Sequence, residues 1–195
     1  MHIQPDSLST RRLYEAMVAL ITPRPIAWIS TRSRDGVDNV APYSFFNGVG
    51  ANPPTVMFCP ALRGDGSRKH THENALASGE FVVNLVTEPV FDAMKQSALE
   101  TEDDEFEMAG LEKADSQVVN APRVATAVAA MECRLHTALQ LGTGPGGANL
   151  VIGTIVSIYA SQDILDDDGR IDPERVRTVG RMGGPRYCRT LDRME

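Results

Sequence analysis

Cysteine is scarce in this chain of 195 residues, which holds only three, at positions 59, 133 and 188. They are widely spaced and form neither a CxxC pair nor a zinc-binding pattern. We therefore interpret them as buried free thiols, and we predict no metal site. Cys59 stands apart from the other two because it ends a short apolar segment beside the residues that are the best candidates for binding.

Long hydrophobic runs and a positive charge excess are missing as well. No segment approaches the roughly 20 apolar residues of a membrane span, and residues 1–17 lack the apolar core of a signal peptide. Lysine and arginine number 19 against 26 acidic residues, which gives a net charge of −7 and no basic footprint for nucleic acid. We predict a single cytoplasmic domain over residues 1–195, with no membrane and no nucleic acid as partner.

Short apolar and β-branched segments follow one another along the chain with few helices between them. We predict strands over residues 26–33, 40–49, 55–59, 80–86, 131–141 and 150–159. We predict helices over residues 9–20, 70–78 and 89–99, and a short helical stretch from residue 173. Because strands cluster instead of alternating with helices, the pattern favours a mainly β protein, an antiparallel barrel with flanking helices.

The glycine-rich segment 142–147 matches the string GxGxxG of dinucleotide-binding proteins. That fingerprint requires a following helix, whereas the residues after this segment are β-branched and Pro145 lies inside it. We reject the dinucleotide fingerprint. A plain hairpin loop and a loop that borders a substrate pocket both remain open.

The best candidate for anion binding is the start of the predicted helix 70–78. A helix N-terminus offers free N–H groups and a partial positive charge, and Lys69 and the hydroxyl of Thr71 add to both. A phosphate cradle and a solvated basic turn both fit this segment. His70 and His72 would not share a helix face and have no evident third ligand, so we predict no metal there.

No catalytic residue can be assigned from spacing. The sequence shows no arrangement that argues for a Ser-His-Asp triad. We interpret Asp103, Asp104 and Glu105 as solvated surface and not as a catalytic pair of carboxylates.

Residues 24–60 combine polar side chains and exposed backbone with aromatic side chains, the mixture needed to hold a flat aromatic cofactor with a polar tail. The polar residues are Ser30, Thr31, Ser44 and Asn47, and the aromatic ones are Trp28, Tyr43, Phe45 and Phe46. The motifs RPIAWIST, NVAPYSFFNGV, PPTVMF, KHTHEN, GEFVVNLV and VGRMGGPRY follow in this order. In these motifs the chain resembles the flavin reductase-like, FMN-binding split-barrel family from about residue 20 onward.

The resemblance implies a split β-barrel that binds FMN in a groove at a homodimer interface. The phosphate and ribityl contacts it implies are Ser30, Thr31, Lys69, Thr71 and Asn74. The residues it implies along the isoalloxazine edge, largely through backbone, are Tyr43, Ser44, Phe45, Phe46 and Asn47. Trp28 would lie near the ring, and Arg181 and Tyr187 from the tail would close the site.

The resemblance implies an oxidoreductase, and three functions stay open. The first is an NAD(P)H:flavin reductase that transfers hydride from NADH or NADPH to FMN, with a monooxygenase as a possible electron acceptor. The second is an FMN-carrying electron-transfer protein of the flavoredoxin type. The third is a split-barrel oxidase acting on pyridoxine phosphate, or a binder of another cofactor such as haem; the match over residues 24–60 favours FMN over it.

Two positions depart from the family pattern. His70 stands where the family has an acid between the lysine and the threonine of the phosphate motif. Gly147, Ala148 and Asn149 stand where many flavin reductases have a glycine, an acid and a histidine. Because that histidine serves nicotinamide handling in the family, its replacement counts against NAD(P)H as the donor.

Overall fold

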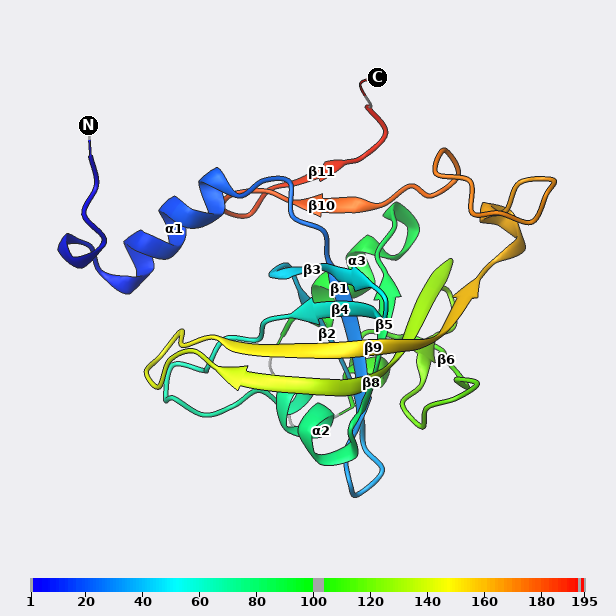
Figure 1. Ribbon diagram of the computed structural model, residues 1–195, viewed down its shortest axis with the longest axis horizontal. Helices are drawn as coiled ribbons and strands as arrows, with labels where there is room; N and C mark the ends of the chain where they lie inside the picture. Colours follow the sequence, from blue (N-terminus) through cyan, green and yellow to red (C-terminus); the bar gives the residue numbers. More distant parts are fainter. Residues whose placement is uncertain (1, 100–103, 193, 195) are drawn as a thin grey trace.

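The computed structural model describes residues 2–99, 104–192 and 194, and its main element is one antiparallel sheet (Figure 1). Seven strands lie in the order β2-β1-β5-β8-β9-β4-β3. Their bounds are β1 Ala27–Arg32, β2 Asp38–Tyr43, β3 Phe46–Ala51, β4 Pro54–Phe58, β5 Glu80–Leu85, β8 Ala129–Gln140 and β9 Asn149–Ala160. The sheet is not closed into a ring, since β2 and β3 form its edges. The predicted mainly β fold of the split-barrel kind is confirmed.

Shorter elements surround this sheet. The helices are α1 Thr10–Leu20, α2 His70–Ser78, α3 Phe91–Gln96 and α4 Glu105–Met108, with 3₁₀ turns at Pro5–Ser7, Glu88–Val90 and Gln162–Ile164. Two small ribbons pair β6 Lys113–Ala114 with β7 Arg123–Val124, and β10 Val179–Arg181 with β11 Tyr187–Arg189. The helical stretch predicted from residue 173 is wrong: Pro173 begins a turn, which the bond from Arg175 N to Asp172 O closes at 3.1 Å.

The predicted strand 40–49 is two strands in the structure. The chain bends at Ser44 and Phe45, between β2 and β3. The Phe45 carbonyl accepts a bond from Cys59 N at 2.9 Å, and the Ser44 hydroxyl accepts one from Arg24. Both partners are distant in sequence, and they hold the bend where the alternation of side chains suggested one continuous strand.

Among the described residues, three hydrophobic clusters fill the interior, and strand β1 contributes to the two larger ones. Its side chains alternate, so Trp28 joins one cluster and Ala27 and Ile29 join the other. Trp28 is fully buried, and its indole N–H donates to the Ser97 hydroxyl at 2.8 Å. Consecutive residues of this strand therefore face opposite sides of the sheet.

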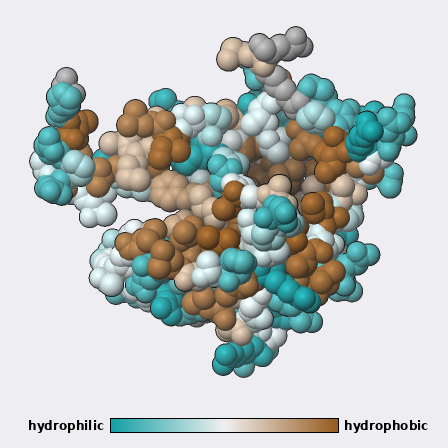
Figure 2. All heavy atoms as spheres, viewed as in Figure 1, coloured by the Kyte–Doolittle hydropathy of each residue, from teal (hydrophilic) through white to brown (hydrophobic). Residues whose placement is uncertain are grey.

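Helix α1 extends away from the sheet (Figure 1), and Met17 and Leu20, which form its apolar stripe, are exposed. Ser9 caps it, as its hydroxyl accepts a bond from Arg12 N, and within the helix only Val18 is buried. Leu20 is 85% exposed. Figure 2 shows hydrophobic surface on this helix and on the sheet below it, with a hollow between the two.

Candidate functional site

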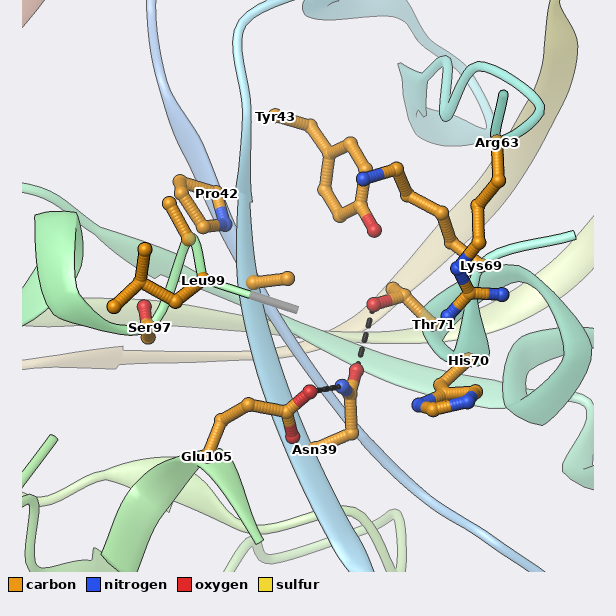
Figure 3. Close-up of a pocket in the computed structure, with 12 residues that line it drawn as sticks. Asn39, Pro42, Tyr43, Arg63, Lys69, His70, Thr71, Ser97, Leu99 and Glu105 are labelled. Carbon is orange, nitrogen blue, oxygen red and sulfur yellow. Dashed lines mark hydrogen bonds between the residues drawn. The ribbon is translucent and has the colours of Figure 1, made fainter. Parts of the chain in front are cut away.

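A small polar pocket lies between the start of α2, strand β2 and the segment around α4 (Figure 3). We call it the Lys69 pocket. It is lined by Asn39, Ala41, Pro42, Tyr43, Arg63, Lys69, His70, Thr71, Ser97, Ala98, Leu99 and Glu105. Its volume is about 60 Å³, whereas sites for whole drug-sized ligands span roughly 300–1,000 Å³. The pocket can therefore hold one end group of a ligand, with the rest outside.

The Lys69 pocket is built for an anion. Helix α2 begins there with Lys69 as its N-cap, and the Lys69 side chain makes no capping hydrogen bond to the helix. A helix start of this kind presents backbone N–H groups and a partial positive charge. Lys69, Arg63 and the Thr71 hydroxyl surround the same space (Figure 3). Inside a protein of net charge −7, this concentration of donors favours a phosphate group.

A hydrogen-bonded network of buried polar groups backs the pocket. Thr71 Oγ1 donates to Asn39 Oδ1 at 2.6 Å, and Asn39 Nδ2 donates to Glu105 Oε1 at 2.6 Å. Thr31 Oγ1 also donates to Asn39 Oδ1, at 3.3 Å, and accepts from Asn74 Nδ2 at 3.2 Å. The network thus joins three predicted phosphate and ribityl contacts, Thr31, Thr71 and Asn74, to two residues that the sequence did not single out as functional.

The interpretation of Glu105 as solvated surface is wrong. Glu105 is the first residue of helix α4. It is only 5% exposed, and it lines the pocket. Burial raises the pKa of Glu105 to about 7, and the bond from Asn39 opposes that rise only in part. Asp104 is the N-cap of α4 and pairs with Lys113 at 2.5 Å, and Asp103 lies outside the described residues.

A second group of predicted residues gathers around Arg24, which the sequence analysis did not single out. We call this the Arg24 corner. Arg24 is buried, its Nε donates to the Ser44 hydroxyl at 3.2 Å, and its guanidinium lies 5.9 Å from the centre of the Phe45 ring. Since Ser44 directly follows Tyr43, the Arg24 corner and the Lys69 pocket lie on the two sides of one chain bend. The RPI motif carried no local signal for this role, because Ser44, Phe45 and Met182 are distant from Arg24 in sequence.

The predicted residues of the tail join the Arg24 corner. Arg181 lies in β10 and exchanges two backbone hydrogen bonds with Arg24. The Arg24 N–H donates to the Arg181 carbonyl at 2.9 Å, and the Arg181 N–H donates to the Arg24 carbonyl at 2.8 Å. The Arg181 guanidinium carbon lies over the Tyr187 ring, 4.3 Å from the ring centre. The Tyr187 and Phe91 rings meet edge-on, with their centres 4.7 Å apart. Arg181 and Tyr187 also line a larger cleft of about 590 Å³ between α1 and the β10–β11 ribbon. The structure therefore places both tail residues at an open cleft.

The remaining predicted residues are divided between interior and surface. Trp28 and Ser30 are fully buried and point to the face of β1 opposite Thr31. The Ser30 hydroxyl bonds to the Pro122 carbonyl and accepts from Asn84. Phe46 is half-buried, and Asn47 is exposed and accepts a bond from Gly48 N. Trp28 and Ser30 thus lie apart from the Lys69 pocket, and Phe46 and Asn47 continue the bend.

The segment that departs from the family pattern has a structural role. Asn149 is buried, and its backbone and side-chain N–H groups both donate to the Pro60 carbonyl, at 3.0 and 3.2 Å. Gly147 lies so close to Gly142 and Gly144 that a Cβ there would meet backbone atoms within 3 Å. These contacts fix a tight hairpin turn between β8 and β9. No residue of 142–147 lines the Lys69 pocket or the cleft beside α1. A plain hairpin loop and a loop that borders a substrate pocket both stay open.

Thiol, metal and membrane features add little to the site. The three cysteines are free, and burial raises the pKa of Cys59 and takes that of Cys133 to about 12, so both stay protonated near neutral pH. His72 is buried while His70 lines the pocket, so the two histidines lie on different faces of α2. Over residues 2–99, 104–192 and 194, no cluster of three metal-ligating side chains occurs. Nor does any helix in those ranges have the length and apolarity of a membrane span.

Comparison with known proteins assigns the family. A model of the flavin reductase-like domain matches residues 19–174. Nitrilotriacetate monooxygenase component B from Bacillus cereus is 33% identical, with a TM-score of 0.93 over 100% of this chain and 98% of that one. 2-Nitrobenzoate 2-nitroreductase NbaA from Pseudomonas fluorescens is 30% identical, with a TM-score of 0.91 over 100% and 94%. A split-barrel protein from Shewanella frigidimarina, described as a flavin reductase, is 26% identical, with a TM-score of 0.83 over 100% and 97%.

This chain belongs to the flavin reductase-like family and has its split-barrel fold. The family resemblance found in the sequence motifs is confirmed. Membership supports a flavin cofactor and a flavin-related oxidoreductase activity. The residues present fit a flavin phosphate, because the Lys69 pocket offers cations, a hydroxyl and a helix N-terminus in a space of end-group size.

Proposed function

We propose that this protein binds FMN and acts as an NAD(P)H:flavin oxidoreductase, with NADH or NADPH as the hydride donor. The Lys69 pocket carries the proposal, because it places Lys69, Arg63 and Thr71 around the open start of α2. A phosphate-bearing flavin fits this donor set better than an uncharged flavin does, since charge-assisted hydrogen bonds are the strong ones. The proposed cofactor is therefore FMN.

The proposed contacts follow from the two sides of the bend. Lys69 and Thr71 would hold the phosphate, with Thr31 and Asn74 supporting them through the network behind the pocket. The backbone of residues 43–47 would run along the isoalloxazine edge. Arg181 and Tyr187 would close the site from the cleft beside α1. Trp28 and Ser30 are not part of this contact set, because both side chains are buried in the sheet.

FMN, when bound, accepts hydride and passes electrons on, and the protein positions it. Hydride transfer requires the reacting atoms to approach within about 3–3.5 Å, which an open cleft beside the bend permits. Lys69 and Arg181 provide positive charge near the proposed site. Fixed cations stabilise negative charge that develops on a bound group. The hydride transfer itself requires no acid or base from the protein.

One observation favours the second candidate, an FMN-carrying electron-transfer protein without NAD(P)H turnover. Asn149 stands where many flavin reductases have the histidine for nicotinamide handling, and its amide is buried against Pro60. Its side-chain N–H is already bound to the Pro60 carbonyl. A protein donor would then supply the electrons, and FMN would stay bound throughout.

We also propose that the working form is a homodimer. The accessible surface is 11438 Å², whereas a compact monomer of 21.2 kDa exposes roughly 9,100 Å². Helix α1 and strand β9 both carry exposed apolar side chains, with Leu20 at 85% and Ile158 at 59% exposed. A stable dimer interface buries about 1,200–2,000 Å² or more. The excess surface is of that size.

A monooxygenase is one proposed electron acceptor. The Bacillus cereus relative is the component B of a nitrilotriacetate monooxygenase. By analogy, this protein would deliver reduced flavin to a partner enzyme. This proposal predicts release of reduced FMN, which the electron-carrier alternative does not.

The test is an absorbance spectrum of the purified protein, followed by anaerobic addition of NADH and then NADPH. A flavin spectrum that bleaches within seconds supports the reductase and identifies the donor. A flavin spectrum that persists with both nucleotides, but is reduced by a chemical reductant, supports the electron carrier. Failure to bind added FMN at any concentration up to millimolar would overturn both.

A further inference from the structure

We propose that protonation of Glu105 controls the Thr71 hydroxyl through Asn39, so that the Lys69 pocket takes up the flavin phosphate together with a proton. The inference rests on the proposed function, since it assumes that FMN places its phosphate in this pocket. It assigns Glu105 and Asn39 as positioning residues that act through the Thr71 hydroxyl. Figure 3 shows the two hydrogen bonds that join Thr71 to Asn39 and Asn39 to Glu105, and all three residues line the pocket.

The direction of each hydrogen bond follows from Glu105. An ionised carboxylate can only accept hydrogen bonds, so Asn39 must turn its Nδ2 toward Glu105, at 2.6 Å. The amide oxygen then faces the other way and accepts the Thr71 proton at 2.6 Å. A threonine hydroxyl has a single proton. Thr71 therefore shows only lone pairs to the pocket, which a phosphate oxygen also carries.

Protonation of Glu105 permits the opposite arrangement. The carboxylic acid can donate its proton to Asn39 Oδ1, and the amide then turns Nδ2 toward Thr71. Thr71 Oγ1 accepts that bond, and its own proton becomes available to a phosphate oxygen. Thr31 suits both arrangements, because a hydroxyl can donate to the amide oxygen, as it does at 3.3 Å, or accept from the amide nitrogen.

Charge acts in the same direction as hydrogen bonding. Glu105 lines the pocket and is 5% exposed, so little water screens its charge from a phosphate there. The neutral acid removes this repulsion. Burial brings the pKa of Glu105 to about 7, so both forms exist near neutral pH before any ligand binds. An anion in the pocket raises that pKa further, and by linkage its binding takes up a proton.

The other charged groups around Glu105 are of two kinds. Asp38 from β2 and Asp104 from α4 are held by Lys113, at 2.9 and 2.5 Å, and Arg32 also binds Asp38. Burial would raise the pKa of Asp38, but the bonds from Arg32 and Lys113 lower it overall. Helix α3 carries Asp92 and Lys95, which pair with each other at 2.7 Å at the surface.

The start of α2 contributes the groups that need controls. Lys69, and Arg63 from the preceding loop, line the pocket and supply its positive charge. His70 also lines the pocket, so it needs a control variant of its own. His72 is buried beside Arg68, and burial first and then that charge lower its pKa. The second ionisation of a phosphate near pH 6 acts in the opposite sense, because the dianion binds more tightly.

The experiment measures the dissociation constants of FMN and riboflavin between pH 6.5 and 8.5, by flavin fluorescence, for the wild type and two variants. We expect wild-type affinity for FMN to fall about tenfold over this range, the scale that linkage to one group with a pKa near 7 allows. Riboflavin lacks the phosphate and should show no fall. Glu105→Gln should bind FMN without the fall, because the amide mimics the neutral acid. His70→Asn is the matched control and should keep the fall.

A second measurement covers the case in which Glu105→Gln does not fold. Calorimetry of FMN binding to the wild type at pH 7.5, in buffers of different ionisation enthalpy, should show net uptake of about half a proton, the mean value that a tenfold fall over two pH units implies. Zero uptake or proton release would overturn the inference, as would an unchanged fall in Glu105→Gln or an equal fall for riboflavin. Loss of the fall in His70→Asn would assign the proton to His70 instead. Absence of FMN binding at every pH would overturn the proposed function itself, and FMN binding independent of pH only this inference.

Discussion

The buried side chain of Arg24 donates from Nε to the Ser44 hydroxyl at 3.2 Å. Its other nitrogens donate to the carbonyls of Val18 and Ile21 at the end of α1, at 3.0 and 2.6 Å, and to that of Met182 in the tail, at 3.2 Å. One guanidinium thus joins the N-terminal helix, the bend after β2 and the C-terminal segment. These three parts border the proposed flavin site.

Replacing Arg24 with alanine should weaken both the fold and the site. The change leaves three carbonyls and the Ser44 hydroxyl without their donor, so we expect a loss of about 2–4 kcal/mol in the free energy of unfolding. Urea denaturation measures this loss, and FMN titration should show weaker binding because the bend is no longer held. Arg11→Ala is the control, since Arg11 is 88% exposed and pairs only with Glu15. Equal effects of the two substitutions would contradict the role given to Arg24.

Lys69→Ala should discriminate between phosphorylated and unphosphorylated flavin. We expect FMN affinity to fall by about 1–3 kcal/mol, the scale of one charge-assisted hydrogen bond. Riboflavin affinity should be unchanged, because Lys69 is assigned to the phosphate alone. Lys95→Ala serves as the control, since Lys95 pairs with Asp92 at the surface of α3. An unaltered FMN affinity in Lys69→Ala would remove Lys69 from the phosphate site.

Glu105 should make the folded state less stable as pH rises. Its pKa is about 7 in the fold and 4.5 ordinarily, so the unfolded chain releases this proton first. Stability is therefore lost as pH rises from about 4.5 to about 7, and the cost levels off above that at about 3 kcal/mol. Glu105→Gln should remove this loss, which denaturation at pH 5 and pH 8 would reveal.

The Asp38 carboxyl has a lowered pKa, because bonds from Arg32 and Lys113 outweigh its burial, so its contribution to stability is lost only in acid and does not affect the Glu105 comparison. The same pH dependence in wild type and variant would show that Glu105 does not titrate in this range.

Local sequence signals were sufficient for some elements and not for others. Helix α2 has the predicted bounds because Lys69 precedes it and Gly79 ends it in the left-handed conformation, with φ of 72°. The division of the predicted strand 40–49 depends on Arg24 and Cys59, which no local pattern reveals. Elements with their own start and stop residues could be predicted, and those set by distant contacts could not.

Part of the candidate site could be predicted from the sequence, and part depends on contacts between distant residues. Lys69, Thr71 and Tyr43 were predicted and share a pocket. Ser30 and Thr31 were both assigned to the phosphate side, although neighbours in a strand face opposite sides, and the structure turns Ser30 inward. Glu105 was concealed within an acidic run, because its burial depends on Asn39, 66 residues away in sequence.

A methyl group at Gly153 should destabilise the barrel. A Cβ at this position in β9 would overlap the Phe81 ring and lie 3.1 Å from Cys133 Cβ. We expect Gly153→Ala to cost about 1–3 kcal/mol in the free energy of unfolding, as overpacked cores do. Phe81→Leu makes room, so the double variant should be more stable than the sum of the single effects predicts. Strict additivity in the denaturation cycle would contradict the close approach of Gly153 and Phe81.

A charge on the apolar stripe of α1 should dissociate the proposed dimer. Leu20 is 85% exposed in the single chain, and if a second copy covers it, Leu20→Asp buries an unpaired carboxylate at the interface. Sedimentation should show the wild type as a dimer of twice 21.2 kDa and this variant as a folded monomer. Val37→Asp is the control, because Val37 is also exposed but lies in the β1–β2 turn, far from α1 (Figure 1). If the flavin groove is formed between two copies, Leu20→Asp should also lose FMN affinity while keeping its circular dichroism spectrum. A monomeric wild type that still binds FMN tightly would separate flavin binding from dimerisation and contradict the shared groove.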